Sequence, residues 1–369
     1  MTDLFIELIQ VSLGNRVRLS YIPSQYEWAS LYNFAQSQSL VGIAFEGINK
    51  LSNSDPESIA TLSPVLKLQW LGNSEIIRQN NQALNKRCCE LYSKILKDGY
   101  ESCILKGPGI SALYPVELRD LRATGDIDIW IKGNREAVVK YAKSQFGFNG
   151  LDFKHLHTIL YNDVPVELHY LPCVFRNPFY NKRLAEFINR ASKFDYLVLD
   201  KYRIAIPNIE FNIVYILQHI FSHLFAEETN SKQYVDYYFV LHSFARIAGN
   251  RDKAYHTICK LGMRKFCCGV MWILVNYLGM SEDLVIGEID EKEGRFLLGR
   301  LLSNSPSQHQ YKSYKTPFFR KVVVLLRQTS KNFQLFTHYP FEVIWSPIWL
   351  VRHYLWKKWW YFKHRDILD

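Results

Sequence analysis

The segment GDIDIWI, at residues 125–131, decides the fold class of this chain. Alternate side chains of a β-strand lie on the same face, so Asp126 and Asp128 point the same way, with Cα atoms about 6.5–7 Å apart. The isoleucines between them point toward the opposite face, where they suit a hydrophobic core. We therefore expect a buried strand over residues 126–131 that presents an exposed pair of carboxylates.

Short elements are expected on both sides of this strand. Residues 103–105 are apolar and predict a strand, and the turn KGPG at residues 106–109 leads into a short helix at residues 110–114. Asn134 is suited to cap a helix that runs to about Phe146. The strand that carries the aspartates thus lies between a short strand-and-helix unit and a following helix.

A hairpin is predicted downstream. Residues 155–161 and 165–170 favour strands, and Asn162-Asp163 between them is typical of a tight turn. Residues 197–206 suit a last strand or an extended connection. The interval therefore mixes strands and helices in an α+β pattern.

Helical periodicity dominates both ends of the chain. Apolar residues at positions 84, 88, 91 and 95 recur at helical spacing, and Gly99 suits the end of that helix. Residues 211–225 and 234–247 are apolar and periodic in the same way. We predict an N-terminal helical region at residues 1–98, an α/β core at residues 99–207, and a C-terminal helical domain at residues 208–369.

The composition is that of a folded protein, with 48% hydrophobic and 22% charged residues among 369. A net charge of +10 favours anionic partners such as nucleotides, nucleic acid or an acidic membrane surface. The seven cysteines include no Cys-x-x-Cys pair, which indicates buried, reduced thiols. Neither a signal peptide nor an apolar run near the roughly 18 residues of a membrane span is present, so we expect a cytoplasmic protein.

Two carboxylates on one strand face suit Mg²⁺, which prefers hard oxygen ligands and keeps substrate phosphates in its shell. Glu167 is the candidate third carboxylate. Its neighbours Val166 and Leu168 are expected to face the core, so the side chain of Glu167 should point to the opposite face of the strand. Paired metal ions can stabilise the attacking and leaving oxygens of an in-line displacement. The alternative is that the alternating segment is only a solvated sheet face.

Several sequence blocks occur in a fixed order. They are Leu105-Lys106-Gly107, Leu113-Tyr114-Pro115, Arg122-Ala123-Thr124-Gly125-Asp126-Ile127-Asp128-Ile129-Trp130-Ile131, Lys154-His155-Leu156-His157, Val166-Glu167-Leu168-His169, His219 with His223, and Lys232-Gln233-Tyr234-Val235-Asp236-Tyr237. Together these blocks resemble the uncharacterised nucleotidyltransferase family of the DNA polymerase β superfamily, over roughly residues 95–245. At position 232 that family more often has arginine.

The resemblance implies a minimal nucleotidyltransferase fold, with a mixed sheet flanked by helical regions. It also implies three metal-binding catalytic carboxylates, which are Asp126, Asp128 and Glu167 at the matching positions. The implied cofactor is Mg²⁺, with Mn²⁺ as an alternative. The implied donor is a nucleoside triphosphate such as ATP, with pyrophosphate leaving. The acceptor is left open among small molecules, peptides, proteins and RNA, and neither the base nor the oligomeric state is predicted.

Four residues are candidates for nucleotide binding. Gly107 lets the backbone approach a phosphate, and Lys106 supplies a positive charge beside it. Pro108 removes one backbone N–H that might otherwise serve a phosphate. The guanidinium of Arg122 suits triphosphate oxygens, although a structural salt bridge is the alternative. Gly125, directly before the strand with the two aspartates, is the fourth candidate.

The hairpin histidines are candidates for substrate contact. A two-residue loop places Thr158 opposite Glu167 and turns His157 to the other face. A three-residue loop places His157 opposite His169, on the Glu167 side. The sequence does not fix this register, so the face of His155 and His157 is left open.

His219 and His223 are four residues apart and share a helix face. Their segment lacks the glutamate of a zinc-protease helix, which argues against a zinc site there. Asp236 is expected to help these histidines to close the pocket. All three are further candidates for substrate contact.

The C-terminal stretch, residues 345–365, interleaves tryptophans with lysines and arginines. It suits packing on its own domain, stacking on bases, or a membrane interface.

As a whole, the chain is predicted to be a metal-dependent nucleotidyltransferase. The alternative is a catalytically silent protein on the same fold that binds an anionic partner.

Overall fold

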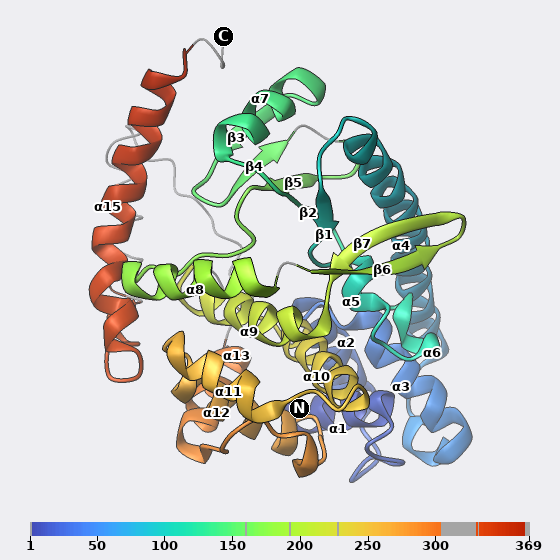
Figure 1. Ribbon diagram of the computed structural model, residues 1–369. Coiled ribbons are helices and arrows are strands. Elements are labelled where there is room, and N and C mark those ends of the chain that lie inside the picture. The colour runs from blue at the N-terminus through green and yellow to red at the C-terminus, as the bar shows by residue number, and fades with distance from the viewer. Residues whose placement is uncertain are drawn as a thin grey trace, which may run out of the picture.

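The computed structural model describes residues 2–158, 161–191, 193–226, 229–303, 330 and 332–365. At its centre lies a mixed five-stranded sheet in the order β1-β2-β5-β4-β3 (Figure 1). Its strands are β1 (Ser102–Ile104), β2 (Ile127–Ile131), β3 (Phe148–Leu151), β4 (His155–Thr158) and β5 (Val166–His169). Strands β2 and β5 are parallel, and the other neighbours are antiparallel. The predicted α+β class is confirmed.

Strand β2 has an interior place in this sheet, and all of its side chains are buried. Trp130 lies on the same face as Asp128 and stacks on Phe211 of helix α9 (Ile209–Ala226), with ring centroids 6.1 Å apart. Because α9 covers this face, Asp128 is only 3% exposed. The prediction of two exposed carboxylates is therefore wrong for Asp128, whereas Asp126 precedes the strand and is partly exposed.

The turn between β4 and β5 lies at Asn162 and Asp163, as predicted. Both residues have positive φ angles, of 46° and 70°, which a two-residue hairpin turn of type I′ requires. Tyr161 and Val164 close the turn through an antiparallel bridge. Asparagine and aspartate tolerate this backbone region better than most residues, which explains the position of the turn.

The register of this hairpin differs from both registers considered from the sequence. His155 lies opposite His169, and His157 lies opposite Glu167. The pairing in β4 and β5 is offset by one residue from the bridge at the turn. With this offset, the side chains of His155, His157, Glu167 and His169 lie on one face of the sheet.

A second hairpin replaces the single strand or connection expected at residues 197–206. It consists of β6 (Phe194–Leu199) and β7 (Tyr202–Pro207), which pair antiparallel in a sheet of their own. Asp200 has a φ of 51° at the turn. The turn lacks glycine, so the sequence signal for this hairpin is weak.

Helices build the N-terminal region, as predicted. They are α1 (Thr2–Leu13), α2 (Gln25–Ser37), α3 (Val41–Ser54), the short 3-10 helix η1 (Pro56–Ile59) and α4 (Pro64–Lys97). Ser24 and Glu27 form a reciprocal capping box at the start of α2. Gly99, with a φ of 86°, follows the end of α4.

Helices also connect the strands and fill the C-terminal region. Besides α9 they are α5 (Pro108–Ser111), α6 (Val116–Arg119), α7 (Arg135–Gln145), α8 (Pro178–Ala191), α10 (Ser231–Arg246), α11 (Arg251–Lys260), α12 (Arg264–Asn276), η2 (Glu282–Leu284), α13 (Glu291–Ser303) and α15 (Pro340–Lys363). Asn134 caps α7 as predicted, since its side chain accepts the Ala137 N–H at 2.8 Å. Helix α5 begins and ends earlier than the predicted residues 110–114.

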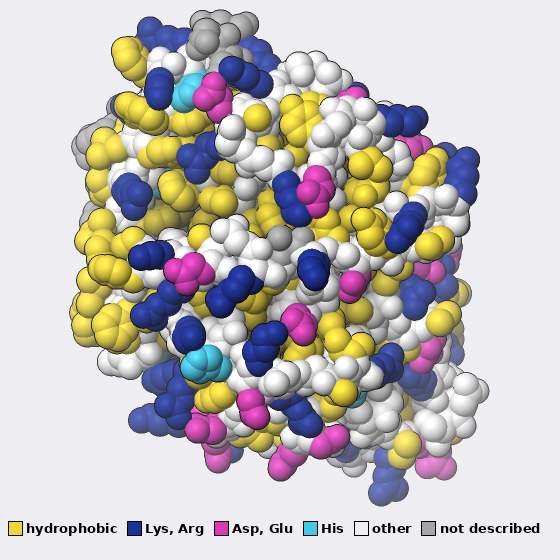
Figure 2. All heavy atoms as spheres, in the orientation of Figure 1, with side chains coloured by type: hydrophobic (Ala, Val, Ile, Leu, Met, Phe, Trp, Pro, Cys, Tyr) yellow, Lys and Arg dark blue, Asp and Glu magenta, His cyan; other side chains and the backbone are white. Residues whose placement is uncertain are grey.

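Helix α15 forms one side of the molecule, at the left of Figure 1. Its inner side is buried at Glu342, Val343, Ser346 and Trp360, so the predicted packing on its own domain is observed there. Hydrophobic side chains gather along its outer side (Figure 2). No helix within the described residues has the length and apolar character to cross a membrane.

Buried apolar residues of all three predicted parts belong to one continuous core. The division at residues 98 and 207 stays a prediction. All seven cysteines are free thiols, and Cys259 alone among them is only partly buried. The prediction of reduced, mostly buried cysteines is therefore confirmed.

Candidate active site

A cavity of about 500 Å³ lies over the sheet face that carries Asp128. Its walls come from the sheet, from the loop after β5, and from helices α9, α10 and α15. Most of the predicted site residues line it, namely Lys106, Gly107, Arg122, Asp126, Asp128, His155, His157, Glu167, His219, His223 and Asp236. Gly125 and His169 lie outside the lining. The fold thus brings residues from sequence positions 106 to 236 to one cavity.

The parallel pairing of β2 with β5 places Asp128 beside Glu167. The two oxygens of Asp128 contact different groups: Lys106 Nζ at 2.8 Å and His169 Nε2 at 2.9 Å. Burial alone would raise the pKa of Asp128, but these two contacts hold it well below its usual range. Asp128 is therefore a carboxylate anion fixed on the floor of the cavity.

The other two carboxylates differ in pKa. Burial raises the pKa of Asp126, and the negative charge of Asp128 raises it further. Burial also acts on Glu167, but hydrogen bonding to His169 and the charge of His155 lower its pKa to about 2. Three acids thus lie together near a single paired ammonium group, Lys106. Closely placed hard oxygen donors with excess negative charge fit a divalent cation such as Mg²⁺ or Mn²⁺.

The Lys106-Gly107 turn contains a glycine with a positive φ angle and is followed by only a short helix. Gly107 has φ 59° and ψ −119°, a conformation that side chains other than hydrogen rarely allow. Helix α5 covers only Pro108–Ser111, so its dipole is small. In the structure the Lys106 ammonium is directed to Asp128. Phosphate binding at this turn stays a prediction.

Arg122 forms a structural salt bridge, which is the alternative that the sequence left open. Its Nε and Nη2 donate to the two oxygens of Asp236 at 2.6 and 2.8 Å, and Nη1 donates to Thr124 at 2.9 Å. The Tyr114 hydroxyl also donates to Asp236, at 2.6 Å. Asp236 therefore holds Arg122 and Tyr114 in place, and it lines the cavity together with His219 and His223.

The hairpin histidines surround Glu167. His155 Nδ1 lies 3.6 Å and His157 Nδ1 lies 3.5 Å from its carboxylate oxygens, and His169 Nε2 lies 3.4 Å away. Burial, together with the nearby His169, lowers the pKa of His155 to about 3. The open question of their orientation is thus answered: both β4 histidines lie on the Glu167 side.

His219 and His223 share one face of α9, as predicted, with ring centroids 4.5 Å apart. Burial lowers the pKa of both, well below the usual range for His219 and to about 4 for His223. Both are therefore neutral at physiological pH. Neither belongs to a group of three possible metal ligands within the described ranges.

The far wall of the cavity contains residues that the sequence did not single out. The Arg176 guanidinium lies over the rings of Phe225 and Trp349, at 5.1 and 5.9 Å. Glu342 of α15 accepts the backbone N–H groups of Arg176 and Asn177 at 3.1 and 3.4 Å. These partners are about 166 residues apart in the chain, so local spacing gave no signal for them.

Two further cations, Lys154 and Lys232, line the cavity. The Lys232 ammonium donates to the Ala123 carbonyl at 3.1 Å, and burial lowers its pKa to about 8. Neither lysine has a carboxylate partner at ion-pair distance in the part of the chain that the structure describes. Their charges are therefore available to an anionic ligand.

The family model described as "Uncharacterised nucleotidyltransferase" matches residues 24–279 of this chain. The match covers more than half of the chain and includes Asp126, Asp128 and Glu167. It ends before helices α13 and α15. No curated protein matches the sequence.

Proposed function

The chain belongs to the uncharacterised nucleotidyltransferase family, and we propose that it moves a nucleoside monophosphate from a triphosphate to an acceptor. An acceptor hydroxyl or phosphate oxygen attacks the α-phosphate, and pyrophosphate leaves. The observation that carries this proposal is that Asp126, Asp128 and Glu167 line one cavity, with Asp128 and Glu167 paired on adjacent parallel strands and Asp126 directly before the first of them.

These three carboxylates would hold the divalent cation, Mg²⁺ or, as an alternative, Mn²⁺. Bound there, such a cation neutralises charge on the triphosphate and stabilises the attacking and leaving oxygens. The crowding of acids that raises the pKa of Asp126 supports this assignment, because a cation relieves it. With the three carboxylates as ligands, His169 is not needed to bind the cation, and its hydrogen bond fixes the orientation of Asp128.

The cationic side chains of the cavity suit the phosphates. Lys154 and Lys232 have no carboxylate at ion-pair distance among the described residues, so their charges can serve phosphates. Lys106 can turn from Asp128 toward a phosphate oxygen once a cation takes that place. Glu167 is better suited to act as a metal ligand than as a general base, because a carboxylate with a pKa of about 2 is a weak base. Arg122 contributes by keeping Asp236 and Tyr114 in place.

Calorimetry with each triphosphate, combined with a pyrophosphate assay, tests this proposal. The wild-type chain should bind one triphosphate in the presence of Mg²⁺ and release pyrophosphate when an acceptor is supplied in cell extract. Asp126→Asn and Asp128→Asn should each reduce release by roughly 10²–10³-fold, in the range found for loss of one stabilising group. Asp195→Asn, at an exposed position on β6, is the matched control and should leave release unchanged.

Asp128 is buried, so thermal unfolding must show that its variant is folded, and the partly exposed Asp126 provides the second test. Release that survives both substitutions would refute the assignment of these carboxylates. Binding heat without pyrophosphate release would identify the catalytically silent binding protein instead.

A further inference from the structure

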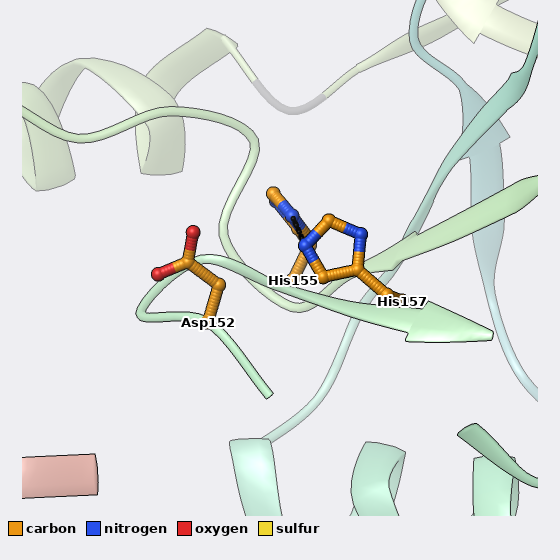
Figure 3. A group of neighbouring side chains, drawn as sticks. All are labelled: Asp152, His155 and His157. Atoms are coloured by element: carbon orange, nitrogen blue, oxygen red, sulfur yellow. Dashed lines mark hydrogen bonds between the residues drawn. The ribbon is translucent and has the colours of Figure 1, made fainter. Parts of the chain in front are cut away.

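Three side chains at the edge of the cavity form a cluster of a different kind. His155 and His157 lie on the same face of β4, and Asp152 lies in the turn before that strand (Figure 3). The Nε2 atoms of the two histidines are 3.1 Å apart. One ligand atom from each of the three residues lies within 4.8 Å of the others.

These separations are close to those of a metal site. Zinc–nitrogen bonds of about 2.0–2.1 Å in a tetrahedral site place two nitrogen ligands about 3.3 Å apart. The spacing of the two imidazole nitrogens therefore nearly matches that of two ligands to one ion, and a bound ion would replace the present hydrogen bond between them. His157 is about half exposed, which gives an ion access from solvent.

The surroundings orient these ligands. Imidazoles that bind a metal through Nε2 carry their proton on Nδ1, and they usually present it to a carboxylate. The Nδ1 atoms of His155 and His157 each face a different oxygen of Glu167, at 3.6 and 3.5 Å. His155 Nδ1 is buried and has no hydrogen-bond partner among the described residues, so the Glu167 carboxylate is its nearest charged acceptor.

Asp152 is also held in place. The Phe153 N–H donates to its Oδ1 at 2.6 Å, and His353 Nε2 of α15 lies 3.1 Å from the same oxygen. These contacts leave the other carboxylate oxygen for a ligand. A helix beyond the family-matched segment therefore supports this residue.

We propose that Asp152, His155 and His157 form a second cation site, selective for a divalent transition metal such as Zn²⁺, beside the three carboxylates. Two imidazoles and one carboxylate are the donor set of catalytic zinc, whereas Mg²⁺ takes oxygen donors. Three protein ligands leave a fourth position, and all three residues line the cavity. That position faces the space where a phosphate or acceptor oxygen would bind.

A second grouping, His155, Glu167 and His169, satisfies the same distance limit. It suits an ion less well, because His169 is almost completely buried and its Nε2 lies 2.9 Å from Asp128. His157 belongs only to the proposed site. It is therefore the residue whose substitution separates the two groupings.

Zinc binding to the full-length, chelator-treated chain tests the proposal without any nucleotide. A chromophoric chelator competes for ZnCl₂ in buffer that contains millimolar Mg²⁺, and elemental analysis gives the zinc content after dialysis. We expect one zinc per chain, with affinity reduced at least tenfold by His157→Ala and by Asp152→Asn. His256→Ala, at an exposed histidine on α11, is the matched control and should bind like the wild type.

Zinc affinity that is unchanged in both His157→Ala and Asp152→Asn would overturn the proposal, as would complete displacement of zinc by millimolar Mg²⁺. X-ray absorption of the zinc-loaded wild type should show mixed nitrogen and oxygen ligands, and a shell of oxygen alone would also overturn it. The outcome is independent of the proposed transfer activity. Asp126→Asn should lose pyrophosphate release and still bind zinc.

Discussion

Two buried clusters of charge flank the same cavity and are built differently. In the first, the guanidinium of Arg122 is matched by the carboxylate of Asp236, and Tyr114 completes the hydrogen bonds. In the second, the carboxylates of Asp126, Asp128 and Glu167 lie near the ammonium of Lys106, which forms its ion pair with Asp128. The first cluster has balanced charge and satisfied donors, whereas the second has more negative charge than its own residues neutralise.

This difference separates a structural role from a functional one. A buried ion pair with complete hydrogen bonds holds two segments together, here the loop before β2 and helix α10. A crowded set of acids costs stability, and it is retained where a ligand supplies the missing positive charge. The four predictions that follow test this contrast, from the largest expected effect to the smallest.

Arg122→Met should break the balanced pair. It leaves the buried Asp236 without its cation, and such losses typically cost about 3–5 kcal/mol in the free energy of unfolding. Urea unfolding followed by circular dichroism measures the change. The double substitution Arg122→Met with Asp236→Leu should recover part of the loss. A cost below about 1 kcal/mol for the single change would show that the pair is not structural.

Glu342 offers a third case, a buried carboxyl that forms no ion pair with another described residue. Burial raises its pKa from 4.5 to about 7, although the N–H groups of Arg176 and Asn177 oppose the shift. The folded chain therefore keeps a proton that the unfolded chain releases. The free energy of unfolding should fall as pH rises from about 4.5 to about 7, by up to about 3 kcal/mol, and stay low above that.

Glu342→Gln should remove this fall, because glutamine carries no charge, while its one carbonyl oxygen can still accept one of the two N–H groups. Unfolding midpoints measured between pH 4.5 and 8 provide the test, with the exposed Glu282→Gln as the matched control. An identical pH profile for Glu342→Gln and the wild type would refute the role given to this carboxyl.

Lys106→Met should make the second cluster still more negative. With its ammonium removed from Asp128, the carboxylates should bind Mg²⁺ or Mn²⁺ about tenfold more tightly in the absence of nucleotide, a difference of about 1.4 kcal/mol. The affinity for a triphosphate should fall, because one phosphate-binding charge is lost. Calorimetry measures both constants. Weaker metal binding in this variant would show that the lysine supports the cluster rather than competing with the ion.

Asp126→Asn should have the smallest effect on stability and the opposite sign to Arg122→Met. Burial and the charge of Asp128 raise the pKa of Asp126, so its charge is disfavoured in the folded state and the neutral amide should stabilise the chain by a small amount. Urea unfolding in metal-free buffer measures the gain. A loss of stability instead would mean that the acids are not crowded.

Features that depend on local spacing could be predicted from the sequence. Alternation placed Asp126 and Asp128 on one face, Asn134 capped its helix, and Asn162-Asp163 made the turn. The family assignment also followed from ordered blocks and is confirmed by the match to residues 24–279.

Features that depend on tertiary contacts could not be predicted. The one-residue offset that turns His157 toward Glu167 occurs outside the turn itself, so the turn sequence does not encode it. The partner of Arg122 lies 114 residues away, and Glu342 reaches the cavity from a helix beyond the matched family segment. The burial of Asp128 likewise depends on α9, which only the fold places over the sheet.

The most direct test of the central claim follows the label from a triphosphate. The wild-type chain, cell extract and Mg²⁺ are incubated with triphosphates labelled at the α- or the γ-phosphate, and the labelled products are separated. The account predicts that an acceptor gains label from the α-phosphate alone, that chelation of the metal prevents this, and that Asp126→Asn abolishes it while Asp195→Asn does not. Label that arrives from the γ-phosphate, or transfer that is equal in Asp126→Asn, would contradict it.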